Sequence, residues 1–400
     1  MSDTTHYHNS LLQYNTRYVI APMINLSDFS YIQLCHTYNA TYSYTQMYWL
    51  NDMMDHNNNK TDYFDNVFDS YPINNVDIPI AIQVGGNNID LMVHCIQLIN
   101  QCNNNRFVAI DINLGCPLRH ARTHLYGAYQ CETIAQRLQT CNLIHSINKC
   151  SILPITCKVR LLNNIDDTLQ FYVSLIQSGC QLLCIHARYI DYNKSVIQRR
   201  YGTADLDTLR YITRQLKQYQ DIRVRQCIVI GNGNVQCYDD VINNISYTSV
   251  DGYMCAESIL NNPAIYTNTH IDAIQLCQQY INLVVANNVT LTPTSINTII
   301  THIRHMLSVD KQSYSNNLLY HLELCQSIDD IQQLVSNISN NTNYYTTFDR
   351  SSMTYNDIHK LKHKQLRQQS GQFNSKERNQ RKRKLAKQEQ YKRLHNSQDV

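Results

Sequence analysis

The sequence has no long hydrophobic run: none of its apolar stretches approaches the roughly 18 residues that a membrane-spanning helix needs. Its N-terminal segment has neither a basic stretch followed by an apolar core nor an amphipathic, Arg-rich character, so no secretory or organelle-import signal is expected. With a hydrophobic content of 43%, these absences predict a cytoplasmic or nuclear protein that buries its own core and contacts no membrane.

Metal-binding patterns are missing as well. None of the 15 cysteines has a second cysteine at the C-x-x-C spacing of zinc ribbons and redox motifs, so no metal site is expected. Several cysteines lie inside apolar runs, among them Cys157, Cys184, Cys227 and Cys255. Most of the cysteines are therefore predicted to be reduced thiols of the core.

The small net charge of +3 hides a difference between two parts of the chain. Residues 357–400 hold 13 Lys or Arg against 4 Asp or Glu, whereas residues 1–356 hold 21 against 27. Such a basic run is typical of a nucleic-acid contact or of a nuclear localisation signal. A merely solvated tail is the alternative.

Eight short apolar runs alternate with stretches of helical periodicity, one of which begins at Ser27 as the expected N-cap. Strands that are apolar along their length are buried on both faces, as in a parallel sheet. Eight strand–helix units over about 250 residues predict an α/β protein with a (β/α)8 TIM barrel, because a doubly wound sheet would need fewer strands. The predicted strands are residues 18–23, 40–48, 78–86, 107–115, 155–161, 182–188, 227–233 and 252–258.

The alternation stops after residue 265. Three amphipathic stretches follow, at residues 271–288, 294–307 and 316–338. We therefore expect a TIM-barrel catalytic domain over residues 1–266, a small helical domain over 270–345, and a linker with a basic tail over 346–400. No motif bears on the oligomeric state, and a monomer is favoured.

Polar residues gather at the carboxyl ends of the predicted strands, where TIM barrels hold their active sites. Cys116 follows the strand that ends near Asn113, and Pro117 stops further strand pairing, so the thiol is expected in the barrel mouth. A thiol with a pKa of about 8.5 is mostly protonated at neutral pH and serves either as an acid or as a nucleophile. Lys158 lies within an apolar strand, where its charge needs an anion or a polar ring, such as a phosphate or a flavin edge.

Two further strand ends favour a phosphate ligand. His186 supplies a possible second donor at the end of the sixth predicted strand. The segments GNGN (231–234) and CAES (255–258) place small residues and backbone N–H groups where TIM barrels often bind phosphate.

These residues stand in ordered blocks that resemble the flavin-dependent tRNA-dihydrouridine synthases. Two of the blocks, DINLGCP with YGAY downstream and MCAESILNNPAIY, are similar to the eukaryotic branch that modifies uridines 16 and 17 of the tRNA D-loop. The blocks between residues 20 and 266 are APMINLSDFSY, YTQMY, IQVGGNN, DINLGCP, ITCKVRL, IHARY, GTADLD, IGNGNV and DGYMCAESILNNPAIY.

The resemblance implies that FMN lies across the barrel mouth and is reduced by NADPH or NADH. Hydride then passes to C6 of a flipped-out uracil, and Cys116 protonates C5. The implied FMN contacts are Pro22, Met23, Gln83, Asn113, Lys158 and His186, with Asn232, Gly233, Ala256 and Glu257 around the ribityl phosphate. The expected contacts with tRNA are Arg119, Arg122, Arg160 and Arg188, helped by the helical domain and the basic tail.

The chain departs from the family pattern in two blocks. HARY replaces the usual H-G-R-T, and the larger Ala187 and Tyr189 are expected to crowd the flavin or the base. Leu118 and His124 likewise replace a common glutamine and a glycine. Two alternatives stay open: an FMN-dependent oxidoreductase of small pyrimidines, which has no use for the basic tail, and a non-catalytic tRNA-binding barrel, which has no use for Cys116 beside Lys158.

Overall fold

The computed structural model describes residues 9–51, 67–73, 77–190, 203–308 and 316–340. The predicted linker and basic tail over 346–400 lie outside the described residues. By its contacts the chain divides into two units, one of which comprises Met1–Val309 with Gln326–Ser336 and contains every strand. The other comprises Asp310–Cys325 with Asn337–Val400.

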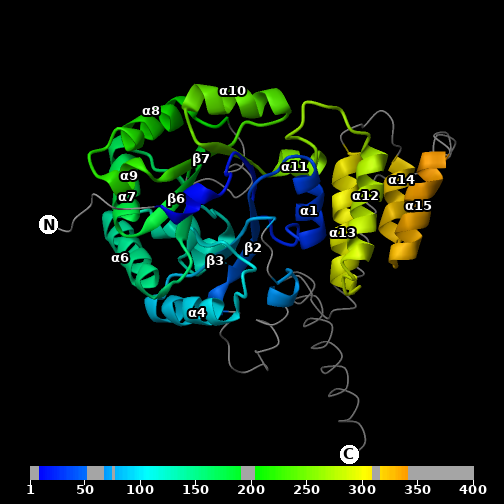
Figure 1. Ribbon diagram of the computed structural model, residues 1–400, viewed down its shortest axis with the longest axis horizontal. Helices are drawn as coiled ribbons and strands as arrows, with labels where there is room; N and C mark the ends of the chain where they lie inside the picture. The colour runs from blue at the N-terminus through cyan, green and yellow to red at the C-terminus, as the bar shows by residue number, and fades with distance from the viewer. Residues whose placement is uncertain (1–8, 52–66, 74–76, 191–202, 309–315, 341–400) are drawn as a thin grey trace, which may run out of the picture. The chain divides into compact units, whose positions relative to one another are not determined.

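The described strands form one parallel eight-stranded sheet in the order β1-β8-β7-β6-β5-β4-β3-β2 (Figure 1). Its two ends meet through backbone hydrogen bonds, because Ile20 N donates to Tyr42 O at 2.9 Å and Thr41 N donates to Tyr18 O at 2.8 Å. The predicted α/β class and the TIM-like barrel are confirmed, with closure limited to these few bonds. The strands are β1 Tyr18–Ile20, β2 Ser43–Trp49, β3 Ile80–Gly85, β4 Ala109–Asn113, β5 Ile155–Leu161, β6 Cys180–Tyr189, β7 Ile228–Asn232 and β8 Gly252–Cys255.

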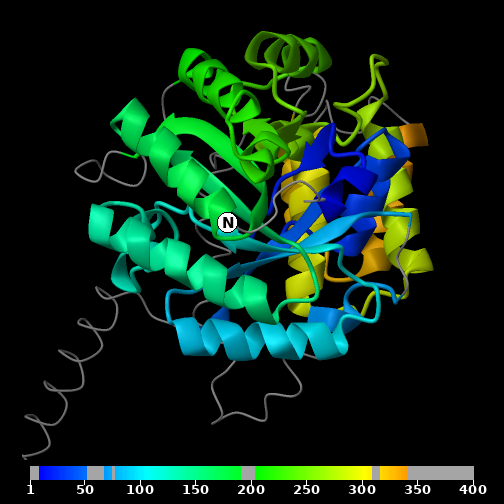
Figure 2. The ribbon, with the colours of Figure 1, turned by 60° about the vertical axis from the view of Figure 1, so that its left-hand side comes forward.

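Helices surround the barrel, and Figure 2 shows α4 and α6 side by side outside the strands. Their bounds are α1 Phe29–Thr37, α4 Ile89–Cys102, α5 Arg119–Thr123, α6 Ile134–Cys150, α7 Ile165–Gln177, α8 Leu206–Lys217, α9 Ile222–Arg225, α10 Tyr238–Thr248 and α11 Glu257–Asn261. After the barrel come α12 Ala273–Ala286, α13 Pro293–Leu307, α14 Asn316–Leu324 and α15 Ile328–Asn340, and two short 3-10 helices are η2 Ser10–Gln13 and η3 Gly127–Gln130. None of the helices in the described ranges is both long and apolar enough to cross a lipid bilayer.

Local hydrogen bonds set where these helices begin. The helix predicted to start at Ser27 is capped instead by Asp28, whose carboxylate accepts from Tyr31 N at 3.0 Å. Ser27 is turned back to the preceding loop and accepts from Met23 N at 2.9 Å, so the prediction of Ser27 as N-cap is wrong. The predicted amphipathic stretch 316–338 is likewise divided into two helices. Ser327 N donates to the Asp330 carboxylate and Asp330 N donates to the Ser327 hydroxyl, and this pair of hydrogen bonds caps the start of α15.

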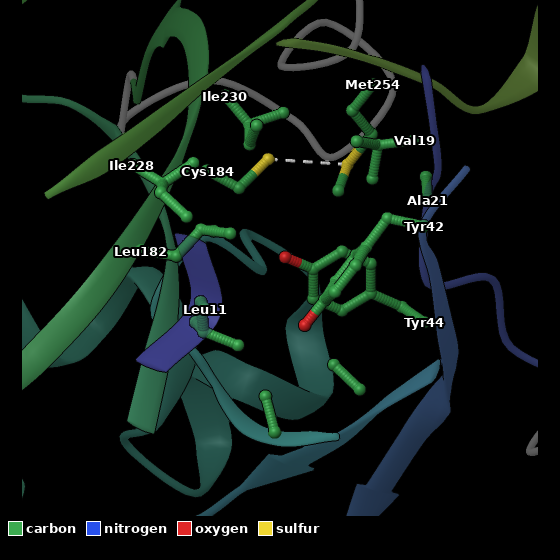
Figure 3. Close-up of a cluster of buried hydrophobic side chains, with 12 residues drawn as sticks. Leu11, Val19, Ala21, Tyr42, Tyr44, Leu182, Cys184, Ile228, Ile230 and Met254 are labelled. Atoms are coloured by element: carbon green, nitrogen blue, oxygen red, sulfur yellow. Dashed lines mark hydrogen bonds between the residues drawn. The ribbon is translucent and has the colours of Figure 1, made fainter. Parts of the chain in front are cut away.

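The barrel interior is filled by alternate residues of the strands and is plugged at one end (Figure 3). The rings of Tyr42 and Tyr44 lie next to each other in this interior, and the Cys184 thiol donates to Met254 Sδ at 3.4 Å. Leu11 of η2 reaches into the same cluster from the amino-terminal end of the strands. Asn9 anchors η2 there by donating to the backbone oxygen of Gln181 at 2.8 Å. The apolar plug leaves the opposite end of the barrel for polar side chains.

Leu11→Ala should destabilise the barrel strongly. Leu11 is fully buried, and its removal leaves a cavity that the surrounding strands cannot refill, so the free energy of unfolding should fall by about 2–5 kcal/mol. Urea denaturation followed by circular dichroism measures this change. The neighbouring Leu12 is 53% exposed, and Leu12→Ala should change the free energy by less than about 0.5 kcal/mol. Equal effects of the two substitutions would contradict the plug.

Helices α12 and α13 pack on α1 and α11 of the barrel. His302 of α13 is fully buried, stacks on Tyr31 with ring centroids 3.8 Å apart, and approaches Asp28 with Nε2 2.8 Å from the carboxylate. Tyr280 of α12 donates a longer hydrogen bond to the same carboxylate at 3.3 Å. Because these contacts are buried and polar, they fix which faces of α12 and α13 meet the barrel.

Candidate active site

Strand register brings the predicted polar residues together at the carboxyl ends of β3 to β7. Asn113 of β4 lies opposite Lys158 of β5, and Arg160 of β5 lies opposite His186 of β6. His186 in turn lies opposite Asn232 of β7. On β6 the inward face changes along the strand from Leu182 and Cys184, which belong to the core, to the polar residues of the mouth. The site is therefore a polar layer directly above the apolar interior.

A chain of side-chain hydrogen bonds leads from a buried carboxylate to the backbone of Cys116. Gln83 donates through Nε2 to Asp111 at 2.8 Å and accepts through Oε1 from Asn113 Nδ2 at 3.0 Å. Asn113 Oδ1 then accepts from Cys116 N at 3.0 Å and from Gly115 N at 3.2 Å. The carboxylate can only accept when ionised, so it sets the orientation of both amides and of the turn that carries the thiol.

Asp111 is the residue at the start of this chain, and sequence reasoning missed it. Thr156 donates to its second oxygen at 2.5 Å. Burial raises the pKa of Asp111 from its ordinary 3.8 to about 6, although the hydrogen bonds from Thr156 and Gln83 and the charge of Lys158 oppose that rise. The available signal was a single charge inside the apolar run AIDIN, at a position that alternates with Asn113.

Asp111→Asn should remove a pH-dependent loss of stability. The raised pKa means that the folded state holds the proton more tightly, so unfolding free energy of the wild type falls as pH rises from about 4 to about 6. A difference of about two pKa units corresponds to roughly 3 kcal/mol. Urea unfolding of both proteins across this pH range should show the wild type losing that amount relative to the variant. Parallel pH profiles would contradict the buried, titrating carboxyl.

The Cys116 thiol is half-buried at the mouth and held from both sides of its backbone. Its carbonyl accepts from Ala128 N at 3.2 Å. Gly127 has φ of 64°, and a Cβ there would lie 2.9 Å from the Cys116 oxygen, so only glycine fits this close approach. Lys158 and Arg160 both interact electrostatically with Cys116.

The basic side chains of the mouth, Arg160, Lys158 and His186, differ in how burial affects their charge. Burial, and then the neighbouring Arg188, lower the pKa of Arg160 to about 10, so it stays charged at neutral pH, and its Nε donates to Gly115 O at 2.9 Å. Burial lowers the pKa of Lys158, whose Nζ donates to Asn232 Oδ1 at 3.1 Å. Burial also lowers the pKa of His186 well below its ordinary value, and the nearby arginines and Lys158 lower it further. His186 is therefore neutral and presents one donor and one acceptor.

The segment GNGN (231–234) at the end of β7, which the sequence favours for binding phosphate, lies beside these residues. Gly233 has φ of 121°, and a Cβ there would lie 2.8 Å from the Ala204 Cβ and 3.5 Å from the His186 ring. Met23 and Ala256 pack partly against the barrel interior. Glu257 is exposed, and its charge acts on His305 of α13, so only its backbone N–H is suited to an anion. Pro22 is half-buried beside Met23.

The four expected substrate arginines divide into two pairs. Arg160 and Arg188 are half-buried on the inward-facing positions of β5 and β6, whereas Arg119 and Arg122 are exposed on α5, just after the thiol. The two replacements expected to crowd the flavin or the base have partners within the protein, and the crowding itself stays a prediction. Ala187 is buried on the strand face opposite His186, and the Tyr189 hydroxyl donates to Asp205 at 2.7 Å at the start of α8.

Polar and partly cationic side chains thus gather around the Cys116 thiol at the mouth of the parallel barrel. In a comparison with protein families, residues 19–394 match the model described as dihydrouridine synthase (Dus). The chain belongs to the dihydrouridine synthase family, and the family expectation is confirmed.

Individual relatives give the same family. The Mus musculus tRNA-dihydrouridine(16/17) synthase (NAD(P)(+))-like protein is 30% identical over 275 residues, which cover 67% of this chain and 51% of that protein. The Saccharomyces cerevisiae tRNA-dihydrouridine(16/17) synthase is 25% identical, covering 62% of this chain and 53% of the relative. A tRNA-dihydrouridine(20a/20b) synthase of the same yeast is 26% identical over 62% and 61%. The chain thus spans about half the length of the (16/17) relatives cited here.

Proposed function

We propose that this chain is an oxidoreductase that reduces uridine to 5,6-dihydrouridine in the D-loop of tRNA, at positions 16 and 17. The observation that carries the proposal is the Cys116 thiol, held at the barrel mouth by the bond of its N–H to Asn113 and within electrostatic reach of Lys158 and Arg160. The names of the relatives support the reaction, and the (16/17) enzymes among them favour the two positions over 20a and 20b.

FMN is the proposed cofactor, and NADPH or NADH the reductant. When bound, FMN supplies the hydride that goes to C6 of the uracil. The mouth suits such a group because Gln83, Asn113 and His186 offer hydrogen-bonding groups, while Lys158 offers a positive charge above an apolar floor. At Gly233 the positive φ and the Ala204 Cβ, 2.8 Å from where a Cβ would lie, admit only glycine.

The remaining proposed FMN contacts follow from the same placement. Pro22 and Met23 would support the ring from the end of β1, since Met23 packs against the interior below. Asn232, Gly233, Ala256 and the backbone of Glu257 would receive the ribityl phosphate. The Glu257 carboxylate itself would repel a phosphate, so its side chain has no part in this contact.

Cys116 is the proposed acid. Saturating a pyrimidine double bond requires a hydride on one carbon and a proton on its neighbour, and the thiol delivers the proton to C5. Asn113, through its bonds to the turn, orients the thiol. The uracil must leave its stack to enter the mouth, and Arg119 and Arg122 on α5 would bind RNA phosphates beside it. Arg160 and Arg188, deeper in the mouth, would contact the flipped nucleotide.

The deciding experiment incubates purified protein, FMN and NADPH with a dihydrouridine-free tRNA transcript. Mass spectrometry of ribonuclease fragments should show a gain of two hydrogen masses in the fragment that holds positions 16 and 17. A gain in the fragment with 20a and 20b would move the site but keep the reaction. No gain in any tRNA, with FMN bound, would overturn the proposal; reduction of free uracil or tRNA binding alone would then distinguish the two alternative functions.

A further inference from the structure

Tyr126 lies against the Cys116 thiol. The residue is only 2% exposed and belongs to a buried cluster against which Cys116 packs, with its hydroxyl in hydrogen-bond contact with the thiol. Burial raises the pKa of Tyr126, and the neighbouring Cys116 raises it further, as a charge and as a hydrogen-bond partner. A phenol with a raised pKa stays neutral at pH 7 and can donate one hydrogen bond while it accepts another.

His120 reaches the same hydroxyl from the solvent side. Its Nδ1 lies 3.2 Å from Tyr126 Oη, and the residue is exposed on α5. The Trp49 ring packs 4.4 Å from the Tyr126 ring and 5.5 Å, edge-on, from the His120 ring. A half-buried thiol, a buried phenol and an exposed imidazole therefore stand in one hydrogen-bonded row.

The backbone that carries Tyr126 is unusual on both sides. Leu125 has φ of 51° and Gly127 has φ of 64°. The left-handed conformation is unfavourable for a non-glycine residue, and Leu125 is 56% exposed, so burial of its own side chain does not offset that cost. Asn87 holds the turn by donating to the Leu125 oxygen at 3.0 Å. The strained turn places Tyr126 next to the thiol, as strain at functional sites commonly does.

We propose that Tyr126 and His120 form a relay that returns a proton to Cys116 after each turnover, an inference that rests on the proposed role of Cys116 as the acid. The S–H bond of Cys116 breaks as its proton goes to C5, which leaves a thiolate. Tyr126 gives its hydroxyl proton to that thiolate while its oxygen takes the Nδ1 proton of His120. The other ring nitrogen of His120, Nε2, takes a proton from solvent, since the residue is exposed. One solvent proton thus reaches C5 per cycle.

The charges that face the thiol make such a donor necessary. Lys158 and Arg160 of β5 both act on Cys116, and both stabilise the thiolate that each proton transfer leaves behind. By stabilising the thiolate, these two cations would slow its reprotonation by bulk water, which would also have to pass through a site filled by product. Tyr126 and His120 lie on the segment 116–126 that follows the thiol in the sequence. They supply a path for the proton that is separate from the product.

The kinetic test compares the first turnover with the steady state. Pre-reduced holoenzyme of Tyr126→Phe and of His120→Ala, mixed with tRNA and quenched, should complete the first turnover within about two-fold of the wild-type rate. Their steady-state rates should fall about 10- to 100-fold, at or below the lower end of general acid–base effects, since the relay only restores the acid. Added imidazole should restore His120→Ala but not Tyr126→Phe, and the double variant should be no slower than Tyr126→Phe.

His124 supplies the matched control. Its ring centroid lies 4.2 Å from that of His120 in a tilted arrangement, but its Nδ1 is bonded to the His120 backbone oxygen and not to Tyr126. His124→Ala should keep the wild-type ratio of first-turnover to steady-state rate. If both rates fall alike in Tyr126→Phe, the residue only shapes the site, and if neither rate falls in either variant, no relay operates. Both results overturn the proposal.

A measurement without turnover separates this inference from the proposed function. Tyr126→Phe removes a donor to the thiolate, so alkylation of Cys116 at neutral pH should slow about ten-fold, as peptide mass spectrometry reports, while exposed Cys237 reacts unchanged. Slower alkylation in a protein that forms no dihydrouridine would leave the thiol–phenol link standing and the synthase function rejected. An unchanged alkylation rate in an active enzyme would reject the relay alone.

Discussion

Cys116→Ala is expected to lower the rate of dihydrouridine formation about 100- to 10,000-fold while FMN stays bound. General acid catalysis contributes this much when the acid is the only donor at the reacting carbon. Lys158 and Arg160 act on the thiol electrostatically, as cations. Neither can take the place of the thiol beside Tyr126 as the proton donor. Rapid-quench mass spectrometry of the D-loop fragment gives the rate, and the flavin absorbance of the purified variant reports cofactor retention.

Cys150→Ala is the matched control for that experiment. Cys150 is a half-buried thiol at the end of α6, bonded to the helix backbone through Ile147 O at 3.2 Å. Its removal should leave the rate unchanged. Cys116→Ser, with a hydroxyl that is a far weaker acid, should resemble the alanine variant. A Cys116→Ala protein that keeps flavin and at least one tenth of the wild-type rate would reject the thiol as the acid.

Lys158→Met is expected to weaken FMN binding about 10- to 100-fold. A hydrogen bond to a charged group is worth about 1.5–3 kcal/mol, and methionine keeps the length of the side chain without its charge. The loss also frees Asn232 Oδ1, which the ammonium holds at 3.1 Å, so the proposed phosphate side is disturbed together with the ring side. Titration of the protein with FMN, followed by quenching of flavin fluorescence, gives the dissociation constant.

The control for Lys158→Met is Lys149→Met, which removes an exposed lysine in the last turn of α6. Its FMN affinity should equal that of the wild type. Far-ultraviolet circular dichroism should show that Lys158→Met is folded, since burial of the cation is costly and its removal does not open the core. Wild-type affinity in a folded Lys158→Met protein would show that the cofactor is held without this lysine.

The barrel could be predicted from the sequence because each strand is short, apolar and flanked by helical periodicity. All eight predicted runs contain an observed strand or most of one, as at residues 155–161, where prediction and β5 coincide. The helix boundaries were harder. Ser27 and Asp28 are both good N-cap residues, and only the loop conformation, in which Ser27 bonds to Met23 N, decides for Asp28.

Site residues were predictable where a motif names them. Gln83, Asn113, Cys116, Lys158, His186 and Asn232 all follow from strand ends and from the family resemblance, and the structure brings them to one mouth. Asp111 and Tyr126 were not singled out, although Asp111 is a single charge inside an apolar run. Their significance depends on burial and on partners in other segments, such as Thr156 and Gln83 for Asp111.

The sequence by itself determined the eight-unit order, the apolar interior and the polar strand ends, because these depend on local periodicity and on the register of successive strands. Tertiary structure alone decided the protonation and the connections of the site. Burial raises the pKa of Asp111 and lowers that of His186, and the backbone turn at Leu125 brings Tyr126 from ten residues further along the chain to the thiol. Desolvation and proximity are properties of the folded chain, which no local pattern encodes.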